Sequence, residues 1–226
     1  AHLFFSLARL DALCGRRVQR VGLSATITPL SLAAEALAWP EKAAVVAPKQ
    51  EKKAAIQVTS AVEDLRVLPS RSIWPEIAGQ VVERCASCRT VLVFLEGRAQ
   101  AEKLANEINA IAGEGFARTH HGCVSKEQRL EAERQLREGK LRVLCATSSM
   151  ELGIDVGDVD LVVQVGCPRS VSGALQRLGR AGHAPGRESV MLLYPKTAGE
   201  ILPCGLTAEL AMEGLLEDAR PPLRCL

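Results

Sequence analysis

Six short apolar runs alternate with helical patterns between Ala54 and Tyr194, and this alternation limits the possible fold more than any other feature. The runs are residues 55–59, 91–95, 116–120, 142–147, 161–166 and 189–194. Most are continuously apolar, which is typical of strands that are buried on both faces of a parallel sheet. With helices between them, they predict an α/β domain of three layers.

Two of the intervening segments carry clear helix signals. Residues 98–111 place apolar side chains at the spacing of one amphipathic face. Ser125 and Gln128 have the form of a capping box, in which the hydroxyl accepts one free amide and Gln128 folds back to another. The second helix is expected to run to about Glu138, with Gly139 as its exit.

The flanking segments differ from this core. Residues 1–47 predict a helix, a strand over Arg17–Leu23 and a second helix that ends near Trp39. Residues 44–54 are small, charged and contain proline, as a linker would. Residues 205–218 predict a helix that leads to a proline pair. The chain starts without Met and stops soon after that pair, so we expect a fragment.

Charge and hydropathy exclude few classes of protein function. The net charge of +2 argues against a strongly basic nucleic-acid binder, although a local basic stripe would not change that sum. Aromatic residues make up only 3% of the chain, so any nucleic acid is expected to be held by phosphate contacts rather than by base stacking. Since the sequence has no apolar run of about 18 residues, we expect no contact with a membrane.

The eight cysteines contain one close pair, Cys85 and Cys88. A structural zinc site needs two such pairs, or one pair and two histidines at suitable spacing, and neither follows. We expect reduced thiols that act as small apolar groups in a cytoplasmic protein. A redox or metal role for the single pair is the alternative.

The segment ALQRLGRAGH, residues 174–183, follows the run that ends at residue 166. Ligands of open parallel sheets gather where the strands end, and the segment is expected at that edge. Arg177 and Arg180 are three residues apart, so on one helix they present two guanidinium forks in one direction, which suits phosphate oxygens. Gly179 and Gly182 allow close approach. The pattern predicts an arginine finger; the alternative is a solvated helix face.

Four segments in order resemble motifs III, IV, V and VI of superfamily 2 helicases. They are GLSATI (22–27), VLVFL (91–95), ATSSMELGID (146–155) and QRLGRAGH (176–183). Together with the run THHG at 119–122, the forms of motifs V and VI are most similar to the large helicase-related (Lhr) group.

The resemblance implies two RecA-like, P-loop NTPase-like lobes that enclose ATP and grip one nucleic-acid strand. Residues 1–47 would be the tail of the first lobe, 48–54 a linker, 55–204 the second lobe, and 205–226 a helical exit toward a further domain. The implied partners are single-stranded DNA or an RNA–DNA hybrid, the missing first lobe and the downstream domains. A place near the nucleoid is also implied.

For ATP, the resemblance assigns Arg180 as the finger, with Gln176 and Arg177 beside it. Gly153 and Asp155 match positions near the ribose. His183 stands where many relatives have a second arginine, so it can supply only a neutral or titrating donor. Without the motif context, Asp155 can simply close a turn.

For the strand, Thr147 matches a hydroxyl that contacts a backbone phosphate, and Arg98, His121 and Gly122 are further candidates, with His120 beside them. In the first lobe, Ser24 and Thr26 would couple the nucleotide state to the strand. Each has a structural alternative, such as a helix cap, a strand end or a polar loop group.

Neither a Walker A loop nor a Walker B box occurs in the 226 residues, so the Mg²⁺ ligands are expected on the missing lobe. We therefore expect an ATP-dependent helicase as the parent protein and no activity from this chain alone. A nucleic-acid or protein adaptor derived from a helicase lobe is the alternative function. An unrelated α/β phosphate-binding or CxxC redox domain would leave the motif III and V segments without a purpose.

Overall fold

The computed structural model describes residues 2–24, 26–39, 41–47, 53–147, 159–182 and 188–218. They belong to two compact units, one within residues 51–215 and the other within residues 1–50 and 216–226. We describe each unit by itself.

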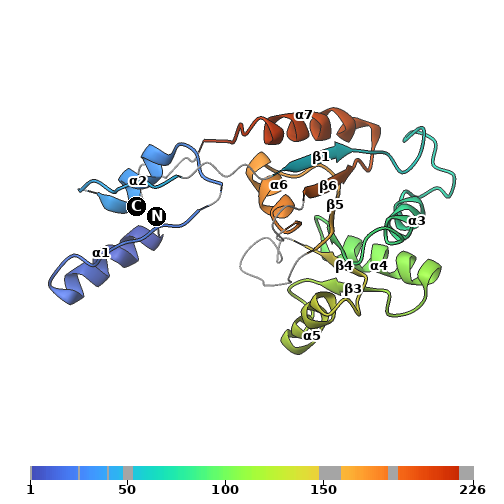
Figure 1. Cartoon of the computed structure of the whole chain (residues 1–226), viewed down its shortest axis with the longest axis horizontal. Helices are drawn as coiled ribbons and strands as arrows, with labels where there is room; N and C mark the ends of the chain where they lie inside the picture. Colours follow the sequence, from blue (N-terminus) through green and yellow to red (C-terminus); the bar gives the residue numbers. More distant parts are fainter. Residues whose placement is uncertain are drawn as a thin grey trace. The chain divides into compact units, whose positions relative to one another are not determined.

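The larger unit is built on a parallel sheet of six strands (Figure 1). The strands are β1 (Ala54–Val58), β2 (Val91–Phe94), β3 (Ala117–His120), β4 (Val143–Ala146), β5 (Leu161–Val165) and β6 (Ser189–Tyr194). Their order is β1-β6-β5-β2-β4-β3, and every neighbouring pair is parallel. All six apolar runs are strands, so the α/β prediction with a parallel sheet is confirmed.

Helices cover both faces of this sheet. On one face, α3 (Trp74–Arg84) and α4 (Arg98–Ala112) pack onto the sheet side chains of one apolar cluster, which includes Val93 and Val163. On the other face, α5 (Lys126–Arg137), α6 (Val171–Leu178) and α7 (Ile201–Met212) pack onto a second cluster with Leu92 and Val162. The result is the expected three-layer arrangement.

α7 corrects the prediction of a helix over residues 205–218. It begins at Ile201, after the 3₁₀ turn η2 (Ala198–Glu200), and ends at Met212. Pro203 is tolerated because it lies in the first helical turn, where its missing N–H has no partner in the helix. Gly214, at φ 72°, adopts the left-handed conformation that commonly ends a helix.

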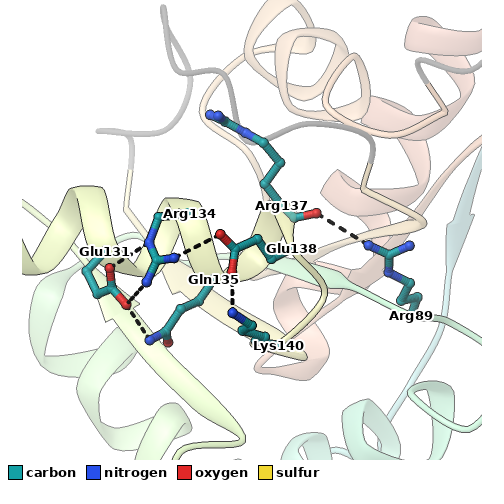
Figure 2. A network of polar contacts seen from close by, with 7 residues as sticks. All are labelled: Arg89, Glu131, Arg134, Gln135, Arg137, Glu138 and Lys140. Atoms are coloured by element: carbon teal, nitrogen blue, oxygen red, sulfur yellow. Dashed lines mark hydrogen bonds and ion pairs between the residues drawn. The ribbon is translucent and has the colours of Figure 1, made fainter.

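α5 has a charged outer face that links its own turns (Figure 2). Arg134 pairs with Glu131 at 2.8 Å and with Glu138 at 2.9 Å, while Lys140 lies 2.7 Å from Glu138. Gly139 follows the helix at φ 71°, as the sequence predicts for its exit. These exposed pairs hold the last turn of α5 in place before β4.

β3 is an edge strand, and α4 satisfies part of its open side. The Asn109 side chain donates to the Ala117 carbonyl at 3.0 Å and accepts from the Ala117 N–H at 2.8 Å. Phe116 O, one residue earlier, accepts from Val143 N of the β4 side. Since the backbone groups of successive strand residues point to opposite sides, Ala117 faces away from β4 and is met by Asn109.

The smaller unit contains α1 (His2–Cys14) and α2 (Leu30–Ala38). The predicted strand over Arg17–Leu23 is wrong: these residues are irregular. A strand needs a neighbour for its N–H and C=O groups, and the described residues of this unit include none.

The irregular segment of this unit is held by side chains instead. Asp11 accepts from the Val18 N–H at 2.9 Å and pairs with Arg20, and Arg20 also donates to the Leu37 carbonyl at 3.1 Å. None of the described side chains of the unit is buried, and Leu13 is 83% exposed. Within its described residues, the unit therefore has no apolar core of its own.

Candidate functional site

The ends of three neighbouring strands, β2, β4 and β3, bring together the side chains predicted to touch a nucleic-acid strand. We call the side of the sheet where its strands end the carboxyl edge, and the side where they begin the amino edge. Arg98 begins α4 after β2, Thr147 follows β4, and Gly122 follows β3. The Thr147 N–H donates to the His120 carbonyl at 3.2 Å, which continues the pairing of β3 with β4.

The two histidines at this edge are buried rather than presented outward. The His120 Nε2 lies 2.8 Å from Glu133 Oε1, and the His121 Nε2 lies 2.8 Å from Glu102 Oε1. The His121 Nδ1 accepts from the Cys123 N–H at 3.3 Å, so Nε2 carries the proton that it donates to Glu102. Both nitrogens of His121 are thus engaged in holding the turn before α5.

That turn presents Gly122 and the start of α5. Gly122 is exposed, and nothing lies within 4 Å of the position that a Cβ would take there. Ser125 caps α5 by accepting from the Gln128 N–H at 3.2 Å, which is the predicted hydroxyl half of the capping box. Arg98 Nη1 lies 2.8 Å from the Cys123 sulfur, so the guanidinium spans the start of α4 and this turn.

The prediction that Arg177 and Arg180 lie on one helix at the carboxyl edge is wrong. α6 starts at that edge, where Ser170 accepts from the Gly173 N–H at 3.0 Å, but it ends at Leu178. A helix that returns from a strand end runs back across the sheet, and its eight residues rise about 12 Å. Arg180 is therefore carried toward the opposite edge, while the Arg177 side chain contacts Gln164 of β5.

The residues after α6 lie at the amino edge. Ala181 forms a bridge with Val159, just before β5, and the Gly182 N–H donates to the Val159 carbonyl at 3.2 Å. Ser189, the first residue of β6, donates from its hydroxyl to the Ala181 carbonyl at 2.7 Å. Arg180 is half-buried in this turn, and its N–H donates to the Arg177 carbonyl at 2.9 Å.

Arg177 is held inside the lobe by contacts with β2 and β5. Its side chain is buried, with its guanidinium carbon 5.2 Å from the centre of the Phe94 ring, and it donates to the Gln164 carboxamide. Gln176, one residue earlier, is half-buried. Sequence reasoning missed Gln164, although one polar residue within the apolar run LVVQVG is a visible signal.

The structure describes only some of the other predicted site residues. Ser24 Oγ accepts from the Thr26 N–H at 3.3 Å, which is a local turn contact within the smaller unit. Gly153, Asp155 and His183 lie outside the described residues.

The surroundings of Cys85 and Cys88 indicate a structural role for this pair. Arg142 donates to the carbonyl oxygens of both residues, and burial raises the pKa of the Cys85 thiol to about 11, away from the thiolate form. Over the described part of the chain, His, Cys, Asp and Glu form no group of three or more that is suited to a metal ion. No helix in that part is long and apolar enough to cross a membrane.

Comparisons with known proteins agree with this fold. Residues 76–185 match the helicase conserved C-terminal domain. The chain is 37% identical to a Lhr helicase/probable uracil glycosylase of Mycolicibacterium smegmatis over 98% of its own length and 17% of the relative. It is 34% identical to the ATP-dependent helicase Lhr-Core of Methanocaldococcus jannaschii over 100% of its length and 26% of the relative. These shares show that the chain spans about a quarter or less of the length of these relatives.

Among solved structures, the Mycobacterium smegmatis helicase Lhr bound to ssDNA and AMP-PNP superposes with a TM-score of 0.91 at 41% identity. That match covers 98% of this chain and 30% of the other. The DUF1998 helicase MrfA bound to DNA and AMPPNP superposes at 0.76 with 22% identity, over 97% of this chain and 32% of the other, and this second match supports the fold alone.

Proposed function

Because this chain belongs to the superfamily 2 helicases, as a segment of the Lhr type, we propose that it is the second RecA-like lobe of an ATP-dependent helicase or translocase. Residues 55–204 form this lobe, and residues 1–47 are the tail of the first lobe, joined to it by a linker at 48–54. Residues 205–226 contain the rest of α7, which packs on this lobe, and then lead to a following domain. The other lobe and that domain are parts of the same polypeptide.

One observation carries the proposal: the candidate strand-binding residues and the candidate finger lie at opposite edges of one sheet. A motor lobe must touch a nucleic-acid strand and a nucleotide at separate places, so that each can be bound without displacing the other. Arg98, Gly122 and Thr147 gather at the carboxyl edge, whereas Arg180 follows the far end of α6.

At the carboxyl edge, the chain holds the phosphates of single-stranded DNA or an RNA–DNA hybrid. The starts of α4 and α5 offer backbone N–H groups and a favourable dipole to phosphate, and Arg98 adds a permanent charge. His121 acts through its two ring contacts, which shape the turn that presents Gly122. Such contacts fix position without reading the base sequence.

At the amino edge, Arg180 neutralises charge on the phosphoryl group during ATP hydrolysis. ATP supplies that group, and the ligands of its Mg²⁺ belong to the part of the first lobe that this sequence does not contain. Gln176 lies beside the finger, Gly153 and Asp155 belong near the ribose, and His183 follows the finger as a weaker donor. Ser24 and Thr26 couple the nucleotide state to the strand.

The experiment is the ATPase rate of the full open reading frame with and without single-stranded DNA, for the parent and for Arg180→Ala. A finger should lose about 10³-fold in turnover on truncation, while strand binding changes little. Arg66→Ala is the matched control, because Arg66 is exposed and pairs only locally with Asp64.

Two results decide against this function. Unchanged turnover in Arg180→Ala, with strand binding intact, would favour the adaptor that binds nucleic acid or protein without hydrolysing ATP. ATPase activity from residues 1–226 alone, abolished by Arg180→Ala, would show that the first lobe is not needed. Association with the nucleoid follows from the same function and is testable by fluorescence imaging of the tagged protein.

A further inference from the structure

Gln164 is a fully buried polar side chain in the apolar layer between the sheet and α6. It is paired in register with Phe94 of β2, and its face of the sheet otherwise carries apolar residues such as Leu92 and Val162. Replacing a buried polar group and its partner by apolar groups of the same shape is often neutral for stability. Folding alone therefore gives little reason for a glutamine here.

The carboxamide of Gln164 joins two parts of the lobe. Its oxygen accepts from the Arg177 guanidinium, while its nitrogen donates to the carbonyls of Val165 at 3.1 Å and Gly166 at 3.0 Å. One side chain thus connects the last turn of α6 to the carboxyl end of β5.

On the α6 side, this contact sets the backbone that carries Arg180. Arg177 is only 8% exposed and lies over the Phe94 ring, so its guanidinium is held by a ring face and a carboxamide. Its own carbonyl accepts from the Arg180 N–H at 2.9 Å. A shift of the Arg177 side chain is therefore passed directly to the turn of Arg180.

On the other side, the contact leads to the carboxyl edge. A Cβ at Gly166 would lie 2.6 Å from Lys196 Cε, so the lysine side chain lies directly over this glycine. Lys196 Nζ is 2.7 Å from Glu96 Oε2, and Glu96 comes two residues before Arg98. The contacts run without a gap from Glu96 through Lys196, Gly166 and Gln164 to Arg177.

The geometry points to Gln164 as a positioning residue that couples strand binding at the carboxyl edge to Arg180. Coupling of this kind is carried by packed and hydrogen-bonded groups that both sites can displace. A strand that draws on Arg98 shifts the Glu96–Lys196 pair against Gly166, and Gln164 passes the shift to Arg177 and the finger. This inference rests on the proposed function.

The kinetic test compares Gln164→Met with the parent in the full open reading frame. We expect the turnover at saturating single-stranded DNA to fall about 10-fold, because a small misplacement of a reacting group is costly. The KM for ATP and the Kd for the strand should stay within about twofold. Gln80→Met is the matched control: it also removes a carboxamide that bonds a neighbour, Tyr194 OH at 3.0 Å, but on the opposite face of the sheet.

A double mutant separates coupling from general damage. If Gln164 acts through Arg180, Gln164→Met should have no further effect on turnover in the Arg180→Ala background, since contacts that act as one unit are not additive. An equal loss in both backgrounds, or the same loss in Gln80→Met, would overturn the inference. Full turnover in Arg180→Ala would instead overturn the proposed function, so the two failures are distinguishable.

Hydrogen exchange gives a readout that needs no ATPase activity. The N–H groups of residues 179–182 all donate hydrogen bonds, and we expect them to exchange faster in Gln164→Met. Gln164→Glu keeps an acceptor for Arg177 but loses the two hydrogen bonds that the carboxamide donates. In this variant residues 179–182 should still exchange slowly, but single-stranded DNA should no longer stimulate ATP turnover as it does in the parent. Unchanged exchange in Gln164→Met, or full stimulation in Gln164→Glu, contradicts the inference.

Discussion

The carboxyl edge and the turn after α6 differ in how firmly the chain holds the residues proposed to bind ligands. At the carboxyl edge, Arg98 and Gly122 lie at the starts of helices or in the turn before one, and Gly122 has open space around it. The turn after α6 is fixed by the Val159 bridge, the Ser189 hydroxyl and the buried Arg177. A mobile polymer can be gripped by exposed groups, whereas stabilisation of a reacting phosphoryl group requires preorganised ones.

The same comparison shows why one helix matters to both regions. α6 begins at one edge with its Ser170 cap and ends near the other edge, so this one helix runs from one region to the other.

Apart from truncation of the proposed finger itself, Gly182→Ala should have the largest effect, and it tests the rigid region. Gly182 has φ 64°, and a Cβ there would lie 2.9 Å from the Glu188 carbonyl oxygen. Both the conformation and the backbone contact oppose a side chain, at a cost of about 1–3 kcal/mol. We expect ATP turnover to fall about 100-fold, with little change in strand affinity.

The matched variant is Gly122→Ala at the carboxyl edge, where a methyl group meets nothing within 4 Å. It should leave thermal stability unchanged, together with the turnover at saturating single-stranded DNA. It should weaken strand binding only if a phosphate lies against Gly122. Equal losses of turnover in the two glycine variants would break the distinction between the edges.

Arg98→Ala should have an intermediate effect, which appears first in strand binding. Loss of one phosphate contact is expected to weaken binding about 10-fold at low salt and to reduce the slope of log K against log salt by about 1. Fluorescence anisotropy over a salt series measures both quantities. An unchanged slope would remove Arg98 from the strand contacts.

Arg134→Ala should have the smallest effect, because its pairs on α5 are exposed and screened by salt (Figure 2). Arg134 lowers the pKa of Glu131 below its usual value near 4.5, and Lys140, with Arg134, lowers that of Glu138. For a lowered carboxyl pKa, the stabilisation is present above the usual value and is lost as the pH falls through the lowered one. The variant and the parent should therefore differ slightly in thermal unfolding at pH 7 and low salt, and converge as the pH falls through the lowered pKa values of these two carboxyls.

The strands were predictable because continuous apolar runs such as VLVFL have few other uses in a soluble domain. The segment Arg17–Leu23 was not, since strand formation depends on a neighbouring strand that its unit does not provide among the described residues. The residues that resemble helicase motifs were found by pattern, but the edge on which each lies depends on where α6 ends. Gln164 is visible in the sequence as one polar residue within an apolar run. Its contact with the buried Arg177, however, is known only from the structure.

The pairing of Asn109 with Ala117 has a consequence for the behaviour of the lobe in a crowded cell. An unpaired strand edge is a template on which another chain can add a strand, and this leads to aggregation. Here an α4 side chain imitates the missing neighbour at one residue of β3. One side-chain amide thus makes β3 less available for pairing with a strand of another chain.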